Sequence, residues 1–168
     1  MDVKEYSIDK IIIKHNTDGD SRVAKRVPTM TEFEEANYSH RADVKKMMGN
    51  FADAITMQAI DHDWSKVKEP YRSMFYRDLC NTIEGKMEFM DGEWARLHYD
   101  VLERHHLKRH HPADVNLIDV IEMLCDCVCA GMARSGDVYD VDIPEEVLIL
   151  AVKNTVELLK ESVEVDSD

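Results

Sequence analysis

The segment 116–134 limits the possible folds more than any other part of the chain. When the segment is drawn as a helix, apolar side chains fall on nearly all of its sides. Such a helix must be covered by neighbouring elements, whereas a surface helix carries a single apolar stripe. We therefore expect a mainly α fold in which this helix is central. Its apolar residues are Leu117, Ile118, Val120, Ile121, Met123, Leu124, Val128 and Met132.

Apolar residues spaced by three and four predict further helices on both sides of the central one. Thr31 and Glu34 have the spacing of a capping box and would begin the first of these helices. If His40 belongs to a functional site, this helix ends near Gly49 and a second one follows, since glycine is costly inside a helix and common just after one. With that break, the predicted helices span residues 31–48, 51–61, 71–84, 92–105 and, after a cap at Asp142, the chain up to residue 163.

An N-terminal β-hairpin is predicted over residues 6–28. Apolar runs lie on both sides of an Asp-Gly pair at 18–19, and this dipeptide between such runs is a strong hairpin signal. The predicted organisation is therefore a hairpin extension at 1–30, an α-helical domain at 31–163 and a flexible tail at 164–168.

The charge of the chain disfavours two classes of partner. Its 34 acidic and 21 basic residues give a formal net charge of −13, so we expect no strong binding to nucleic acid or to an anionic membrane surface. A small phosphorylated ligand is compatible with this charge, because its binding depends on the local field. No apolar run approaches the roughly 20 residues that span a bilayer, and the first residues lack the pattern of a signal peptide. The expected location is cytoplasmic.

Histidine is concentrated in one part of the chain, where six of the eight histidines lie between residues 62 and 111. The first of them, His62, is followed directly by Asp63, so that an imidazole nitrogen and a carboxylate can reach one metal ion. His98 and His105 lie along the edge of the apolar stripe predicted for the 92–105 helix. This pattern predicts a metal site.

Three carboxylates share one face of the predicted central helix, because Asp119, Glu122 and Asp126 are spaced by three and four residues. Burying them without partners would be costly. Metal ions or histidines would provide those partners. In the alternative interpretation the carboxylates pair with basic residues such as Arg104 and Lys108, or face water.

His40 can join this site only under one condition. It precedes His62 by 22 residues, which corresponds to about 33 Å of unbroken helix. The helix would have to break near Gly49 and fold back. If the helix is continuous, His40 lies outside the site.

In their order along the chain these residues resemble the HD superfamily of metal-dependent phosphohydrolases. The stretch beginning at His62-Asp63 and ending at Lys66 is similar to the His-Asp-x-x-Lys box of HD domains that hydrolyse cyclic dinucleotides. A closer resemblance, over about residues 31–136, is to a phage and bacterial HD-like family of unknown function. The matching residues are His62-Asp63-x-Ser65-Lys66, Trp94-x-x-x-His98, Arg104-His105-His106, Glu122-Met123-Leu124-Cys125-Asp126 and Ala130-Gly131.

The resemblance implies an HD-domain-like helical bundle that binds one or two divalent transition-metal ions, Mn, Fe, Co, Ni or Zn. The implied ligands of the first ion are His40, His62, Asp63 and Asp126, with Asp119 as the alternative to Asp126. The implied ligands of the second are His98 with either His105 or His106, and Asp63 as a bridge.

The implied reaction is hydrolysis of a nucleotide phosphomonoester or phosphodiester by a metal-activated hydroxide. Lys66, Arg104 and Lys108 would neutralise the phosphate, while Glu122 would orient a ligand or transfer a proton. Two other functions stay open: a di-iron oxygenase, and a non-catalytic binding or inhibitor protein stabilised by metal. A phage-encoded protein of this kind would act in the host cytoplasm. Homo-oligomerisation is also open, with the hairpin and the last helix as candidate contact surfaces.

Overall fold

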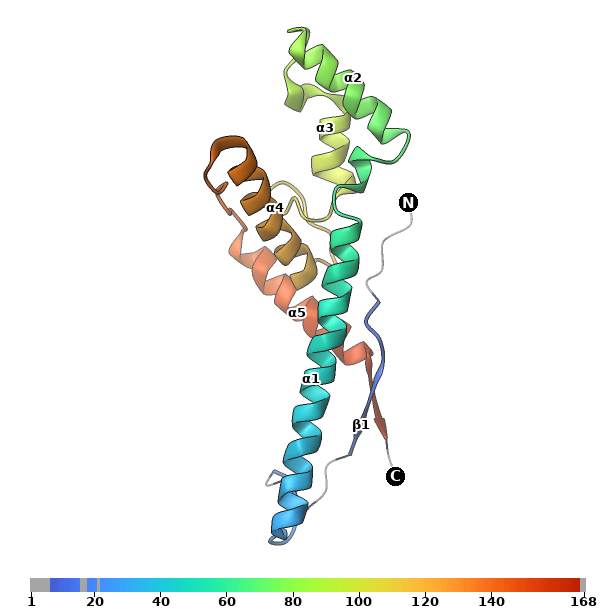
Figure 1. The fold of residues 1–168 in the computed structure, drawn as a ribbon, viewed down its shortest axis with the longest axis vertical. Helices are drawn as coiled ribbons and strands as arrows, with labels where there is room; N and C mark the ends of the chain where they lie inside the picture. The colour runs from blue at the N-terminus through green and yellow to red at the C-terminus, as the bar shows by residue number, and fades with distance from the viewer. Residues whose placement is uncertain (1–6, 16–17, 21, 167–168) are drawn as a thin grey trace. The chain divides into compact units, whose positions relative to one another are not determined.

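The computed structural model describes residues 7–15, 18–20 and 22–166. This part of the chain is mainly α-helical, as predicted (Figure 1). The helices are α1 (Met30–Ile60), α2 (Tyr71–Ile83), α3 (Glu93–Leu97), α4 (Leu117–Ser135) and α5 (Glu145–Glu161). The strands are β1 (Ile11–Lys14) and β2 (Val163–Asp166), and short helical turns lie at Trp64–Lys66, Phe89–Asp91 and His98–Leu102.

The chain divides into two compact units. The terminal unit consists of Met1–Thr56 and Val156–Asp168, and the central unit consists of Met57–Thr155. These bounds differ from the predicted division into an extension at 1–30 and one helical domain at 31–163, because the two ends of the chain belong to the same unit.

The two strands of the terminal unit come from opposite ends of the chain. β1 pairs with β2 in parallel, with Ile11 opposite Val163 and Lys14 opposite Asp166. The predicted N-terminal hairpin is therefore wrong, although its residues 6, 16–17 and 21 lie outside the described part. The predicted flexible tail is also wrong up to residue 166, where β2 ends; residues 167–168 are not described.

The Asp-Gly pair at 18–19 does not form the turn of a hairpin. Gly19 approaches the first turns of α1 so closely that a β-carbon there would lie 2.2 Å from the backbone oxygen of Glu32. The backbone N–H of Ala24 donates to the backbone oxygen of Asp20 at 2.8 Å, which turns the following segment. Only glycine fits at position 19, because any other side chain would collide with the helix backbone.

The first helix begins earlier than predicted and does not break. Its capping box is formed by Thr29 and Glu32: the Glu32 carboxylate accepts the Thr29 N–H at 2.8 Å, and the Thr29 hydroxyl accepts the Glu32 N–H at 3.2 Å. α1 then continues through Gly49 to Ile60. One glycine costs a helix only about 1 kcal/mol, and the next residue, Asn50, is held by a 2.8 Å hydrogen bond to the Asp9 backbone oxygen.

The core of the central unit lies between α4, α5 and the loop that precedes α4. The N-cap of α4 is Asn116, which forms a capping box with Asp119, and Gly136 ends the helix with φ 76°. Both ends agree with the prediction. The buried core residues are Leu107, Val115, Val120, Met123, Val147 and Ala151.

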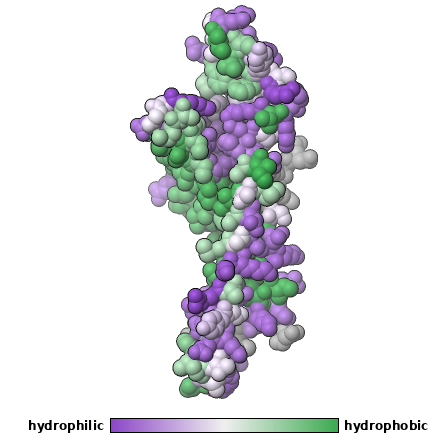
Figure 2. Space-filling view, in the orientation of Figure 1, coloured by the Kyte–Doolittle hydropathy of each residue, from purple (hydrophilic) through white to green (hydrophobic). Residues whose placement is uncertain are grey.

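The helix α4 is not covered on all sides. Its side chains Leu124, Val128 and Met132 are exposed, and so are Leu148 and Val152 of α5. Figure 2 shows a hydrophobic area over these two helices. No helix in the part of the chain that the structure describes has the length and apolar character needed to cross a membrane.

The predicted 92–105 helix ends three residues earlier in the structure and changes character on the way. α3 ends at Leu97, a wider π-helical turn follows at His98–Leu102, and the backbone becomes extended at Glu103. His105 and His106 consequently lie in a loop and not on a helix face.

Candidate metal centre

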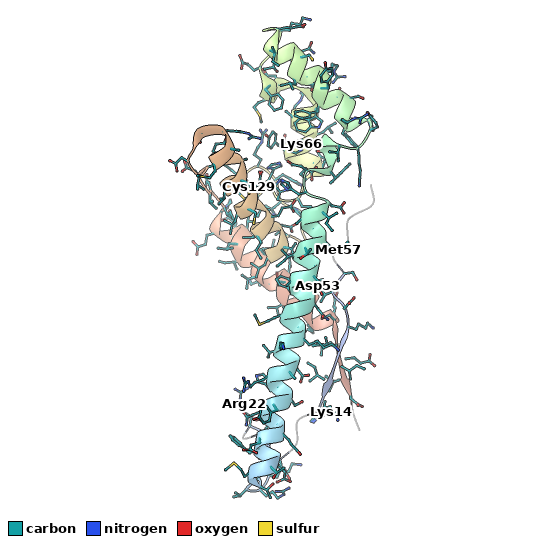
Figure 3. The ribbon with its side chains drawn as sticks, viewed as in Figure 1. Lys14, Arg22, Asp53, Met57, Lys66 and Cys129 are labelled. Atoms are coloured by element: carbon teal, nitrogen blue, oxygen red, sulfur yellow. The ribbon has the colours of Figure 1, made fainter. Side chains whose placement is uncertain are left out.

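The first part of the centre is the turn that follows α1. Asp63 has φ 53° and ψ 34°, a left-handed conformation that aspartate and asparagine tolerate better than most residues. The helical turn Trp64–Lys66 begins directly after it, which returns the side chain of Lys66 to Asp63. The ammonium of Lys66, labelled in Figure 3, donates a hydrogen bond to Oδ2 of Asp63.

Three imidazoles from separate segments converge on the carboxylate of Asp63. His62 Nε2 lies 3.3 Å from Oδ2, while His98 Nε2 and His105 Nε2 lie 3.5 and 3.8 Å from Oδ1. Most of these separations exceed hydrogen-bond length. They are close to the spacing of neighbouring ligands on one ion, about 2.9–3.4 Å when each bond measures about 2.0–2.1 Å.

The donor atoms form two groups that share Asp63. One group is His62, Asp63 and His105, and the other is Asp63, His98 and His106; within each group the ligand atoms lie within 4.8 Å of one another. In the second group, Nε2 of His98 and Nε2 of His106 are 2.9 Å apart. Both groups could hold a metal ion.

Three buried ligand atoms have no hydrogen-bond partner among the described residues: Oδ1 of Asp63 and the two ring nitrogens of His105. His105 is only 1% exposed, so water cannot easily satisfy its nitrogens. A buried polar group without a partner costs about 1–3 kcal/mol. A cation between Asp63 and His105 would provide a partner for Oδ1 of Asp63 and Nε2 of His105, so the residues present fit a metal ion.

Glu122 forms a second layer behind the first group. Its Oε1 accepts a hydrogen bond from His62 Nδ1 at 2.9 Å and lies 3.1 Å from His105 Nδ1, although the latter contact lacks hydrogen-bond alignment. The amide of Gln58 donates to the other oxygen. Burial raises the pKa of Glu122, but the contacts with His105 and His62 outweigh it and lower that pKa to about 2. The carboxylate therefore favours a proton on each Nδ1 and leaves each Nε2 facing Asp63.

The charge state of His62 responds to the same carboxylates. Its contacts with Asp63 and Glu122 raise the pKa of His62 to about 10. Burial alone would raise the pKa of Asp63, but the contacts with His62 and Lys66 lower it well below its usual range. A metal ion bound at His62 would take the place of the Nε2 proton.

The histidines of the second group are neutral and held in place. Burial lowers the pKa of His98 to about 3 and that of His106 to about 2, so both have the uncharged form that binds metals. The ring of His98 stacks on Trp94 with centroids 4.3 Å apart. The Nδ1 atom of His98 lies 2.8 Å from the Ser65 hydroxyl, and the Ser65 N–H donates to Glu103 at 2.9 Å.

The two candidate aspartates of α4 have different surroundings. Oδ1 of Asp126 lies 3.7 Å from His62 Nε2, at the edge of the first group. Asp119 is fully buried and accepts two hydrogen bonds from Arg104, at 2.8 and 2.9 Å, and one from the Asn116 N–H. The structure therefore places Asp119 in neither ligand group, with its oxygens engaged by Arg104 and the helix cap.

Three further predicted site residues are placed elsewhere. Arg104 pairs with Asp119 and Asp114, and its contact with a phosphate stays a prediction. Lys108 is exposed and forms its ion pair with Asp142 at 2.9 Å. His40 lies on α1, which runs from Met30 to Ile60 without a break near Gly49, so the condition for His40 to join the centre is not met.

A protein-family model matches residues 29–164 of the chain. The chain belongs to DUF5662, a family of unknown function. No curated protein and no solved structure gives a significant match.

The DUF5662 match begins at Thr29, the residue that caps α1, and contains every residue of the candidate centre. It also contains two supporting residues that the sequence did not predict, Gln58 and Glu103. The position of Gln58, one helical turn before His62, could have indicated that it lies near the site. Nothing in the sequence indicates the contact of Glu103 with Ser65, because the two residues come from distant segments.

Glu122→Gln should weaken metal binding by about 10–100-fold without unfolding the protein, since glutamine keeps the shape of the side chain but not the charge that aligns two imidazoles. Metal affinity measured by competition with a chelator would check this. The exposed Glu146→Gln on α5 is the matched control and should leave affinity unchanged. Equal affinity in the two variants would show that Glu122 does not position the ligands.

Proposed function

We propose that this protein is a metal-dependent phosphohydrolase that acts on a nucleotide phosphomonoester or phosphodiester. One observation carries the proposal: two groups of imidazole ligands share the carboxylate of Asp63 and leave buried donor atoms unpaired. Asp63 would be a ligand of the ion in either group, and metal ions held here would supply chemistry suited to displacement at phosphorus. The resemblance to the HD superfamily in the sequence around His62 supports the same chemistry.

The geometry favours one division of the ligands between two ions. His62 and His105 would bind the first ion, with Asp126 at its edge, and His98 and His106 would bind the second. Imidazole and carboxylate ligands suit Mn, Fe, Co, Ni or Zn better than magnesium. Bound ions of this kind lower the pKa of a water ligand toward neutrality and polarise a phosphoryl group.

The side chains around the ligands would bind and orient the substrate. Lys66 is the cation in direct contact with Asp63, and it would turn to a phosphate oxygen as negative charge develops there. Glu122 would hold His62 and His105 in the productive tautomer. Ser65 and Trp94 would do the same for His98 by hydrogen bonding and stacking.

Elemental analysis combined with an activity assay tests the proposal. The purified protein is measured as isolated and after loading with Mn, Co or Ni, and phosphate release from a panel of nucleotides is followed on the same samples. We expect tightly held ions and release that depends on them. Stoichiometric iron with oxygen consumption and no hydrolysis would replace the proposal with a di-iron oxygenase. Bound metal without either reaction would favour a metal-stabilised binding protein.

Lys66→Ala should lower turnover by about 10²–10³-fold while metal content stays at the wild-type level, because the ammonium acts on the charge of the phosphate. Steady-state kinetics and elemental analysis on the same preparation would check both parts. Lys68→Ala is the control, since Lys68 lies over the ring of Trp64 and outside the ligand groups. Loss of metal together with activity would instead assign Lys66 to holding Asp63 in place.

A further inference from the structure

The N-terminal part of α1 exposes an apolar stripe within the terminal unit. Its members are spaced by three, four or eleven residues, about one or three helical turns, and therefore share one side of the helix. They are Met30, Phe33, Val44 and Met48, all exposed, followed by the half-buried Phe51 and Ile55. A different side of the helix faces the rest of the unit, where Met47 contacts Ser162 and Asn50 contacts Asp9.

A surface pocket lies within this stripe. It is lined by His40, Arg41, Val44, Lys45 and Met48. Four of these residues, from Arg41 to Met48, have the spacing i, i+3, i+4 and i+7. Four residues at this spacing form the hole that receives a side chain from a facing helix in coiled-coil packing. The same stripe carries an exposed aromatic side chain, Phe33, two turns before the pocket.

The charged residues beside the stripe favour one orientation of a facing helix. Glu34 lies beside its N-terminal part, and Arg41 and Lys45 lie beside its later part. A second copy in antiparallel orientation, with its Phe33 in the pocket, would place Glu34 within one turn of both Arg41 and Lys45 of the partner subunit. Because the arrangement has two-fold symmetry, every contact forms twice. A parallel copy in register would leave Glu34 seven and eleven residues along the axis from Arg41 and Lys45 of the partner subunit, about 10 and 16 Å, too far for an ion pair.

The terminal unit also has little apolar interior of its own. Among its described residues the buried apolar side chains are Ile8, Ile11 and Ala54. A helix depends on the packing of an apolar face for most of its stability. The exposed stripe of α1 is therefore the part of this unit that gains most from being covered.

We propose that two copies of this chain associate through α1, antiparallel, with Phe33 of each copy in the pocket formed by Arg41, Val44, Lys45 and Met48 of the other. The inference does not depend on the metal centre, and it assigns a role to the segment around His40.

A charge-exchange experiment tests orientation and register together. Sedimentation equilibrium should show a dimer of the wild-type chain. Glu34→Lys should weaken it by about 10-fold or more, and so should the double variant Arg41→Glu/Lys45→Glu, because each homodimer then brings like charges together. An equimolar mixture of the two proteins should restore association, as should the triple variant that carries all three changes. The weakening should diminish at high salt.

An apolar substitution provides the second arm. Phe33→Ala should weaken the dimer at low and high salt alike, whereas Tyr76→Ala, which removes an exposed aromatic side chain of α2 in the central unit, should not. Circular dichroism confirms that each variant keeps its helices. A wild-type monomer up to high micromolar concentration overturns the proposal. A dimer whose affinity is unchanged in these variants also overturns it, and would point to another face such as the apolar side of α4 and α5. Failure of the equimolar mixture to associate overturns it as well.

Discussion

Replacing Asp63 by asparagine is expected to remove bound metal and phosphate release together. Asp63 is the one residue shared by both ligand groups, so the change withdraws the charged ligand from each. Asparagine tolerates the left-handed backbone conformation at this position, which separates the loss of charge from backbone strain. We expect metal affinity to fall by more than about 100-fold, beyond the effect of removing a supporting residue.

The measurement is elemental analysis after loading, with hydrolysis assayed on the same sample. Asp53→Asn is the matched control, because Asp53 is an exposed aspartate of α1 (Figure 3) and lies outside the ligand groups. Wild-type ion content and rate in the Asp63 variant would contradict the proposed centre. Unchanged ion content with lost activity would restrict Asp63 to catalysis and leave metal binding to the histidines.

Replacing Arg104 by methionine should lower the free energy of unfolding of the central unit by about 3–5 kcal/mol. The change leaves the fully buried carboxylate of Asp119 without its cation, and an uncompensated buried charge is strongly destabilising. Both tryptophans, Trp64 and Trp94, lie in the central unit, so their fluorescence during urea unfolding reports on this unit.

Two variants make this prediction specific. Arg109→Met removes an exposed arginine paired with Asp100 and should cost no more than about 1 kcal/mol. Adding Asp119→Asn to Arg104→Met should recover part of the lost stability, since no buried charge is then left alone. If Arg104→Met instead raises KM and leaves stability intact, Arg104 contacts substrate, as its sequence context suggested.

The sequence by itself determined the parts of this protein that depend on near neighbours along the chain. The apolar pattern predicted a mainly α fold and located α2, α4 and α5 closely, because side chains three and four residues apart share a helix face. Asp119, Glu122 and Asp126 could be assigned to one face of α4 for the same reason. The close contact of His62, Asp63 and Lys66 also followed from their positions in the sequence.

Local signals failed where a distant segment competed for the same residues. Asp18-Gly19 has the composition of a hairpin turn, but β1 pairs with a strand about 150 residues later and Gly19 packs on the helix backbone instead. Gly49 has the composition of a helix end, but its cost is small, and the hydrogen bond from the neighbouring Asn50 to the distant Asp9 supports the continuous helix.

Only the tertiary structure decided how the ionisable side chains pair. By their spacing along the helix, Asp119 and Asp126 were equivalent candidates for a metal ligand. In the structure Arg104 neutralises Asp119, and this ion pair distinguishes the two residues. The same loop turns His105 toward one ligand group and His106 toward the other. Charges inside a protein interact with whatever lies within a few ångströms, and those neighbours come from segments whose order along the chain carries no information about their distance in space.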